Sequence, residues 1–181
     1  MHAKGDAQLI LSLAVADKAH ADERLTVRLN EEEIASREVF DQHGTRLHVV
    51  QVSIGRVHVT YDVTIDGHSE LEQCDEIDQI RYLRQSRYCE SDQLGPTARD
   101  RFDGLTGATL LNAVRDWVHQ QLHYVPGSSR SADGAIQAYI ARQGVCRDFA
   151  HLAIALLRSL DVPARLASTY APGLSPMDFH A

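Results

Sequence analysis

Apolar and polar residues alternate along the first third of the chain, a period of two that is typical of strands with one buried face. The alternation is cleanest from Val57 to Ile65. Asp41–Gly44, Gly55 and Asp66–Gly67 interrupt the pattern, and such residues are typical of turns. We therefore expect an antiparallel sheet with one solvated face. The segments predicted to be strands are 25–29, 47–54 and 57–65.

From Leu105 onward the apolar period becomes helical. The first predicted helix has Thr106 or Thr109 as its N-cap. The residues on its apolar face are Leu110, Leu111, Val114, Trp117, Val118 and Leu122. A shorter helix through Ile136, Tyr139 and Ile140 follows, with Ser131 or Asp133 as its cap and Gly144 as its C′ residue.

The third predicted helix begins near Cys146 and ends before Asp161–Pro163. Its apolar stripe has the i, i+3, i+4, i+7 spacing of a buried face. We expect Ala164–Tyr170 and the residues from Asp178 onward to be strands. The residues expected to be buried are Phe149, Leu152, Ala153, Leu156, Leu157 and Leu160.

Leu71–Asp103 is charged and lacks either period, so it is interpreted as a connector. The sequence therefore predicts an α+β protein with an antiparallel, β-sandwich-like N-terminal region and helices packed on an antiparallel sheet. The expected parts are a β-rich region over 1–80, a connector over 81–104 and a core over 105–181.

Composition narrows the classes of partner. The formal net charge is −7, and acidic and basic residues are interspersed, so a nucleic-acid surface is not expected. No apolar run approaches the ~20 residues of a membrane-spanning helix, and the N-terminus lacks the layout of a signal peptide. Three widely spaced cysteines argue against a disulfide framework. We expect a cytoplasmic protein with no nucleic-acid or membrane partner.

Cys146 is the strongest candidate for chemistry. It follows Gly144 and begins the most amphipathic predicted helix, where the helix dipole favours a thiolate. His180 follows 34 residues later, and a distant histidine returned by the fold can serve as the base of such a thiol. Cys74 and Cys89 are interpreted as structural or incidental.

The residues Gly144–Arg165 and Ser168–Ala181 resemble bacterial transglutaminase-like proteins, which are often described as cysteine proteases. The segments Tyr82–Asp92, Trp117–His119 and Tyr124–Ser129 extend the resemblance upstream. It implies a papain-like core in which the cysteine helix packs on a sheet that carries the histidine and an acid.

By this resemblance Cys146 is the nucleophile and His180 the general base, within roughly 3–5 Å of each other. The family's acid lies on a strand beyond the histidine, so we expect a core truncated just after His180, without the third triad residue. Such a core would expose strand edges and apolar surface, and would self-associate or be less stable than a longer form.

Four other residues invite functional interpretations. His119 and His123 have the i, i+4 spacing of a metalloprotease motif, but Gln120 stands where that motif needs a glutamate, so no metal site is expected. Asp148 could tune the site, although an exposed position in the first turn explains an acid there. His151 is expected to pack or face solvent rather than share the face of Cys146.

The sequence thus favours thiol-dependent acyl transfer on a protein or peptide carboxamide, as a cysteine protease, amidase or transglutaminase, with no metal or organic cofactor. Backbone N–H groups at the helix start, including that of Cys146, are the expected oxyanion donors. The alternative is a catalytically inactive transglutaminase-like module that binds a protein or peptide.

Overall fold

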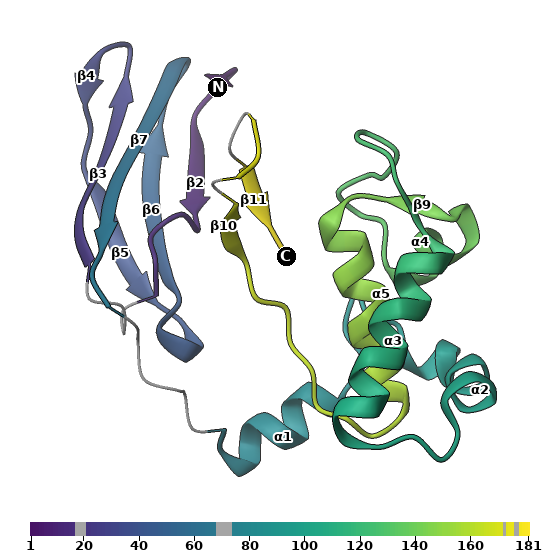
Figure 1. Ribbon diagram of the computed structural model, residues 1–181. Coiled ribbons are helices and arrows are strands. Elements are labelled where there is room, and N and C mark those ends of the chain that lie inside the picture. Colours follow the sequence, from purple (N-terminus) through teal and green to yellow (C-terminus); the bar gives the residue numbers. More distant parts are fainter. Residues whose placement is uncertain (17–20, 68–73, 172, 176–177) are drawn as a thin grey trace. The chain divides into compact units, whose positions relative to one another are not determined.

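The structure is a computed structural model that describes residues 1–16, 21–67, 74–171, 173–175 and 178–181. Its contacts divide the chain into two compact units, Met1–Gln73 and Cys74–Ala181. The first unit contains only strands and one short 3₁₀ turn, and the second contains the five α-helices of the described residues (Figure 1). The predicted α+β class is confirmed.

The first unit consists of two antiparallel sheets (Figure 1). The longest pairing joins Ala21–Leu29 to Val57–Ile65, two segments distant in sequence. One sheet has the order β1 (His2–Ala3), β7 (Gly55–Ile65), β3 (Ala21–Leu29) and β4 (Glu32–Glu33), and the other has β2 (Ala7–Leu11), β6 (Arg46–Val52) and β5 (Ser36–Phe40).

A small valine core joins the two sheets. Val27 and Val57 come from one sheet and Val50 and Val52 from the other, and all four are at most 5% exposed. For β3 and β7 the alternating pattern indicates the buried face, which includes Val27 and Val57. For β6 it does not, because His48, Val50 and Val52 are buried rather than Leu47 and Val49. The sandwich-like N-terminal region is therefore confirmed.

Two of the predicted turns connect strands, as their residues indicate. Asp41 precedes the 3₁₀ turn Gln42–Gly44, which joins the antiparallel pair β5 and β6. Gly55 begins β7, where the chain passes from one sheet to the other. A Cβ at Gly55 would lie 2.5 Å from the side-chain amide of Asn30, which accepts a 2.8 Å hydrogen bond from Arg56 N.

The second unit is mainly helical. Its strands are short: β8 and β9 form a parallel pair, and β10 and β11 an antiparallel one. The helices are α1 (Glu76–Leu83), α2 (Ser91–Phe102), α3 (Gly107–Gln121), α4 (Ala135–Ala141) and α5 (Cys146–Ser159), and the strands are β8 (His123–Tyr124), β9 (Gln143–Gly144), β10 (Thr169–Ala171) and β11 (Asp178–His180).

The segment interpreted as a connector has regular structure instead. Its residues form α1 and α2, and α2 buries Leu94, Ala98 and Phe102 in the core of the second unit. These three residues recur every four positions, but the charged residues between them, together with Pro96 inside the helix, hide the period. Packing against the rest of the unit stabilises a helix that its own sequence indicates only weakly.

The apolar stripe of α5 divides between two environments. Leu152 and Leu156 are fully buried, as expected, whereas Phe149, Ala153 and Leu157 are only half-buried. Ile154 and Ala155, outside the predicted stripe, are buried as well, so the helix packs on more than one side.

Other local predictions have mixed outcomes. Thr106 is the N-cap of α3, as one of the two alternatives held. The N-cap of α4 is Gly134 rather than Ser131 or Asp133. The strand predicted over Ala164–Tyr170 is shorter, since β10 covers Thr169–Ala171 only. No helix among the described residues is both long and apolar enough to cross a membrane.

A group of charged residues connects the two sheets of the first unit. Arg46 on β6 forms ion pairs with Glu23 on β3 and Glu38 on β5. Tyr61 on β7 donates a 2.5 Å hydrogen bond to Glu23 and accepts one of 3.0 Å from the backbone of Val15. Burial acts to raise the pKa of Glu23, but the hydrogen bonds from Tyr61 and Arg46 outweigh it and hold this pKa below its ordinary value.

This network makes a pH-dependent prediction. A carboxyl group whose pKa is lower in the folded state stabilises the fold above its unfolded pKa, and the stabilisation is lost as pH falls through the folded value. We expect Glu23→Gln to weaken the first unit by about 1–2 kcal/mol at pH 7 and by progressively less as the pH falls below 4.5, the ordinary pKa of this carboxyl group. Hydrogen exchange of β3 and β7 peptides should be roughly 5–30 times faster in the variant at pH 7.

Glu33→Gln, at an exposed position of β4, is the matched control and should leave this exchange unchanged. An equal effect of Glu23→Gln at both pH values would show that the ionised carboxylate contributes nothing.

Candidate functional site

Cys146 is the first residue of α5, as predicted. Val145 before it has an extended backbone (φ −109°, ψ 178°) and is the N-cap. The Cys146 side chain is half-buried, so it is supported by its neighbours yet open on one side. The first N–H groups of a helix have no partner within the helix and carry its positive pole, so this position suits a thiolate or an oxyanion.

His180 is the last residue of β11, where it pairs with Thr169 of β10. Together with Cys146 it lines a cavity of about 310 Å³. The two residues singled out by the sequence thus face one space, although the separation of sulfur and imidazole expected above stays a prediction. The other residues that line the cavity are His119, Leu122, Tyr124, Phe149 and Ala181.

The parallel pair β8–β9 brings Tyr124 to this cavity. Tyr124 lies opposite Gly144, two residues before Cys146, and Val125 N donates a 3.0 Å hydrogen bond to Gly144 O. The ring of Tyr124 lies 6.4 Å from that of Phe149, so two aromatic side chains form part of the wall. Sequence analysis missed this wall because it depends on pairing across about 20 residues.

His119 is a second imidazole in the same cavity. The sequence offered it only as a metal ligand beside His123, but His119 lies on α3 and His123 on β8. Within the ranges that the structure describes, no group of three His, Cys, Asp or Glu side chains could hold a metal ion. The placement of His119 makes it an alternative partner for the Cys146 thiol.

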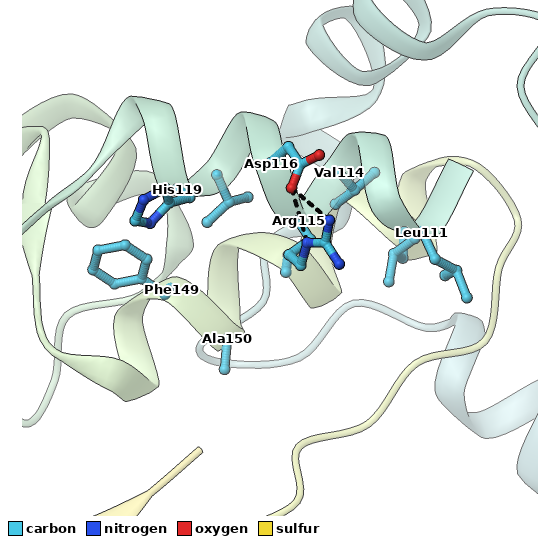
Figure 2. Close-up of a pocket in the computed structure, with 10 residues that line it drawn as sticks. Leu111, Val114, Arg115, Asp116, His119, Phe149 and Ala150 are labelled. Atoms are coloured by element: carbon cyan, nitrogen blue, oxygen red, sulfur yellow. Dashed lines mark hydrogen bonds and ion pairs between the residues drawn. The ribbon is translucent and has the colours of Figure 1, made fainter. Parts of the chain in front are cut away.

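An apolar groove adjoins the cavity and shares His119 and Phe149 with it. Its volume is about 580 Å³, and it lies between α3 and α5. Figure 2 shows Leu111 and Val114 of α3 along it, together with Phe149 and Ala150 of α5. This groove explains why one side of the α5 stripe is only half-buried.

Asp148 differs most from expectation. It is fully buried, not on the exposed surface of the first turn. Its Oδ2 accepts a 2.7 Å hydrogen bond from Val145 N and a 2.6 Å bond from Ser129 Oγ. Its Oδ1 has no hydrogen-bond donor among the described residues, and the nearest cation is Arg147, with Nε 3.8 Å away. Local sequence does not indicate this burial, because the partner Ser129 lies 19 residues away.

Gly144 leaves space for the Asp148 side chain and does not end α4. The residue that caps α4 is Arg142, in the left-handed conformation (φ 57°). A Cβ at position 144 would lie 2.6 Å from Cβ and 2.9 Å from Oδ2 of Asp148. The prediction that Gly144 is the C′ residue is therefore corrected: a glycine is needed here because the side chain of Asp148 fills the space.

His151 packs in the core, one of the two outcomes expected for it. It is 8% exposed, and its ring stacks on Tyr88 at 5.3 Å with an interplanar angle of 7°. Burial lowers the pKa of His151 below its ordinary value, and Arg147 acts in the same direction, against the opposite effects of Asp148 and Glu90. A neutral His151 is therefore favoured at physiological pH.

The other two cysteines differ from Cys146 and from each other. Cys89 is buried, which raises the pKa of its thiol, and Cys74 is exposed. All three cysteines are free. Cys74 and Cys89 therefore provide an exposed and a buried thiol with which the reactivity of Cys146 can be compared.

Comparisons with known proteins identify the family. A family model described as the transglutaminase-like superfamily matches residues 103–181. A crystal structure of a "putative cysteine protease" from Cytophaga hutchinsonii is 31% identical and superposes with a TM-score of 0.81. That match covers 99% of this chain and 67% of the Cytophaga chain. The protein belongs to the transglutaminase-like superfamily.

A curated relative provides a shorter match. An uncharacterized protein of Mycobacterium leprae is 38% identical over 58 residues. The match covers 32% of this chain and 21% of that protein, so the matched segment spans about a fifth of the relative's length.

The contact between Gly144 and Asp148 can be tested directly. We expect Gly144→Ala to destabilise the second unit by roughly 1–3 kcal/mol, since the added methyl group must displace buried, hydrogen-bonded atoms. Trp117 fluorescence during urea unfolding should show the loss, because Trp117 packs against the core of this unit. Gly173→Ala, where nothing lies within 4 Å of the added Cβ, is the control. Equal stability of both variants would contradict the close approach.

Proposed function

We propose that the protein is a thiol-dependent enzyme that acts on the carboxamide or peptide bonds of protein or peptide substrates. The observation that carries the proposal is that Cys146, at the start of α5, and His180, on β11, line one cavity. Membership of the superfamily and the likeness to the Cytophaga protein support a cysteine protease-like function.

The proposed reaction begins with proton transfer from Cys146 to His180. The sulfur then attacks the carbonyl carbon, and the developing oxyanion is stabilised by backbone N–H groups at the start of α5. As the intermediate collapses, the C–N bond breaks, the amine leaves with the proton from His180, and a thioester remains on Cys146. Transfer of the acyl group to water gives hydrolysis, and transfer to an amine gives transamidation.

The character of the cavity supports a substrate without charge next to the reacting carbonyl. Its lining is aromatic or aliphatic apart from the thiol and two imidazoles. No acidic side chain lines it among the described residues, so the group that orients His180 is not assigned. The free state of all three cysteines supports a reducing compartment, and we place the protein in the cytoplasm.

Alkylation by iodoacetamide tests the nucleophile without a known substrate. We expect Cys146 to react faster at neutral pH than exposed Cys74, because the rate follows thiolate fraction and access. Cys89 should react most slowly, since it is buried and its pKa is raised. Mass spectrometry of peptides after brief labelling gives the three rates from one sample. If Cys146 reacts no faster than Cys74, the non-catalytic binding module becomes the better interpretation.

Two histidine variants test the base. His180→Asn should slow the alkylation of Cys146 at neutral pH by at least about threefold, because the thiolate loses its cationic partner. His119→Asn, the other imidazole of the cavity, is the matched variant and should change the rate little. The opposite result would assign the base to His119.

A further inference from the structure

We infer that Asp148 and Ser129 are positioning residues that hold Cys146 and its backbone N–H in the geometry needed for acyl transfer. This inference rests on the proposed function and adds two residues that are not part of the cavity lining. Its starting point is that a carboxylate with no solvent exposure lies two residues after the proposed nucleophile.

The first argument concerns free energy. Burying an ionisable carboxyl group is unfavourable unless its oxygens are fully satisfied, and Oδ1 of Asp148 has no hydrogen-bond donor among the described residues. Asparagine would fill the same volume without the charge. Fold stability alone therefore explains this residue poorly.

The second argument is geometric. Residues on both sides of Cys146 are attached to the same loop. Val145 N and Ser129 Oγ both donate to Oδ2 of Asp148. Arg147 Nη2 donates 3.1 Å hydrogen bonds to Ser129 Oγ and Arg130 O. The backbone of Cys146 is thus held from before and after, while its side chain remains available to the cavity.

The third argument concerns the donors left unpaired. By accepting from Val145 N, the N-cap residue, Asp148 at the third helical position provides the reciprocal half of a capping box, while the valine side chain can provide no acceptor for the other half. Asp148 N bonds to Val145 O at 2.8 Å. The N–H groups of Cys146 and Arg147 have no intrahelical acceptor at this end of the helix and remain directed past its first turn. Donors fixed in this way are those that an oxyanion at the sulfur would require.

Two chemical probes separate positioning from reactivity. Iodoacetamide reacts at a tetrahedral carbon and forms no oxyanion, so it reports only the thiolate and its access. p-Nitrophenyl acetate does form an oxyanion: the sulfur bonds to the acetyl carbon, the C–O bond breaks, and p-nitrophenolate leaves with the electron pair. The ratio of the acylation rate to the alkylation rate at Cys146 therefore measures how well the N–H donors are placed.

Asp148→Ala and Ser129→Ala should lower this ratio by at least about tenfold, given the roughly 100–1000-fold loss when an oxyanion donor is removed outright. Asp148→Asn should restore part of it, because an amide oxygen can still accept from Val145 N and Ser129 Oγ. Peptide mass spectrometry identifies the acetylated and alkylated residue in each case.

Asp78→Ala is the matched control. Asp78 is likewise the third residue of a helix, α1, is 7% exposed, and pairs with Arg81 at 2.9 Å. It should leave the ratio unchanged.

Three results would overturn the inference in distinguishable ways. An unchanged ratio in both alanine variants, with rapid acylation of the wild-type protein, would reject positioning and leave the proposed function standing. A parallel fall of both rates, accompanied by labelling of Cys89, would show a purely structural role. Acylation of wild-type Cys146 no faster than that of Cys74 would instead reject the proposed function.

Discussion

The second unit depends on the packing and hydrogen bonding of the buried Asp148 side chain at the start of α5. The carboxylate fits only because residue 144 has no side chain, and it draws Val145 and Ser129 toward a single oxygen. Three segments therefore have to meet at one place: the end of β9, the first turn of α5 and the loop before α4. Since α5 is central to the core, fixing its first residue also fixes the register in which its apolar positions meet α2, α3 and α4.

The same junction determines what surrounds the thiol. Because β9 precedes α5 directly and pairs with β8, any residue at position 124 lies close to the first turn of the helix. Tyr124 and Phe149 then form an aromatic side of the cavity. The groove along α3 and α5 begins at His119 and Phe149, so apolar surface continues away from the thiol. An extended substrate lying across Cys146 would have apolar contacts on that side.

The sequence alone predicted the features that depend on the local periodicity of apolar residues and on the residues that begin or end helices and strands. The strands of the first unit follow alternation, and the start of α5 follows from Gly144, Cys146 and an amphipathic run. Features that depend on contacts between residues distant in sequence were not predicted. The helix α2 carries its apolar residues between charged ones, and its burial requires the rest of the core. An exposed position explained Asp148 in the sequence, because an acid in the first turn of a helix is usually solvated. Its burial depends on the hydrogen bond from Ser129 and on the space beside Gly144, which only the fold reveals.

The buried carboxylate also limits what the helix dipole can do for the thiol. The positive pole of a helix is equivalent to about half an elementary charge. Asp148 places a buried acidic side chain in the first turn, and Nε of Arg147, whose side chain is 40% exposed, lies 3.8 Å from its Oδ1. A carboxylate at this position opposes the positive pole that the first turn of α5 presents to Cys146. A thiolate here would need a cationic neighbour across the cavity, and the imidazoles of His180 and His119 are the titratable groups placed to provide it. Under the proposed function, the histidine side of the cavity supplies the base, while the helix supplies position and N–H donors.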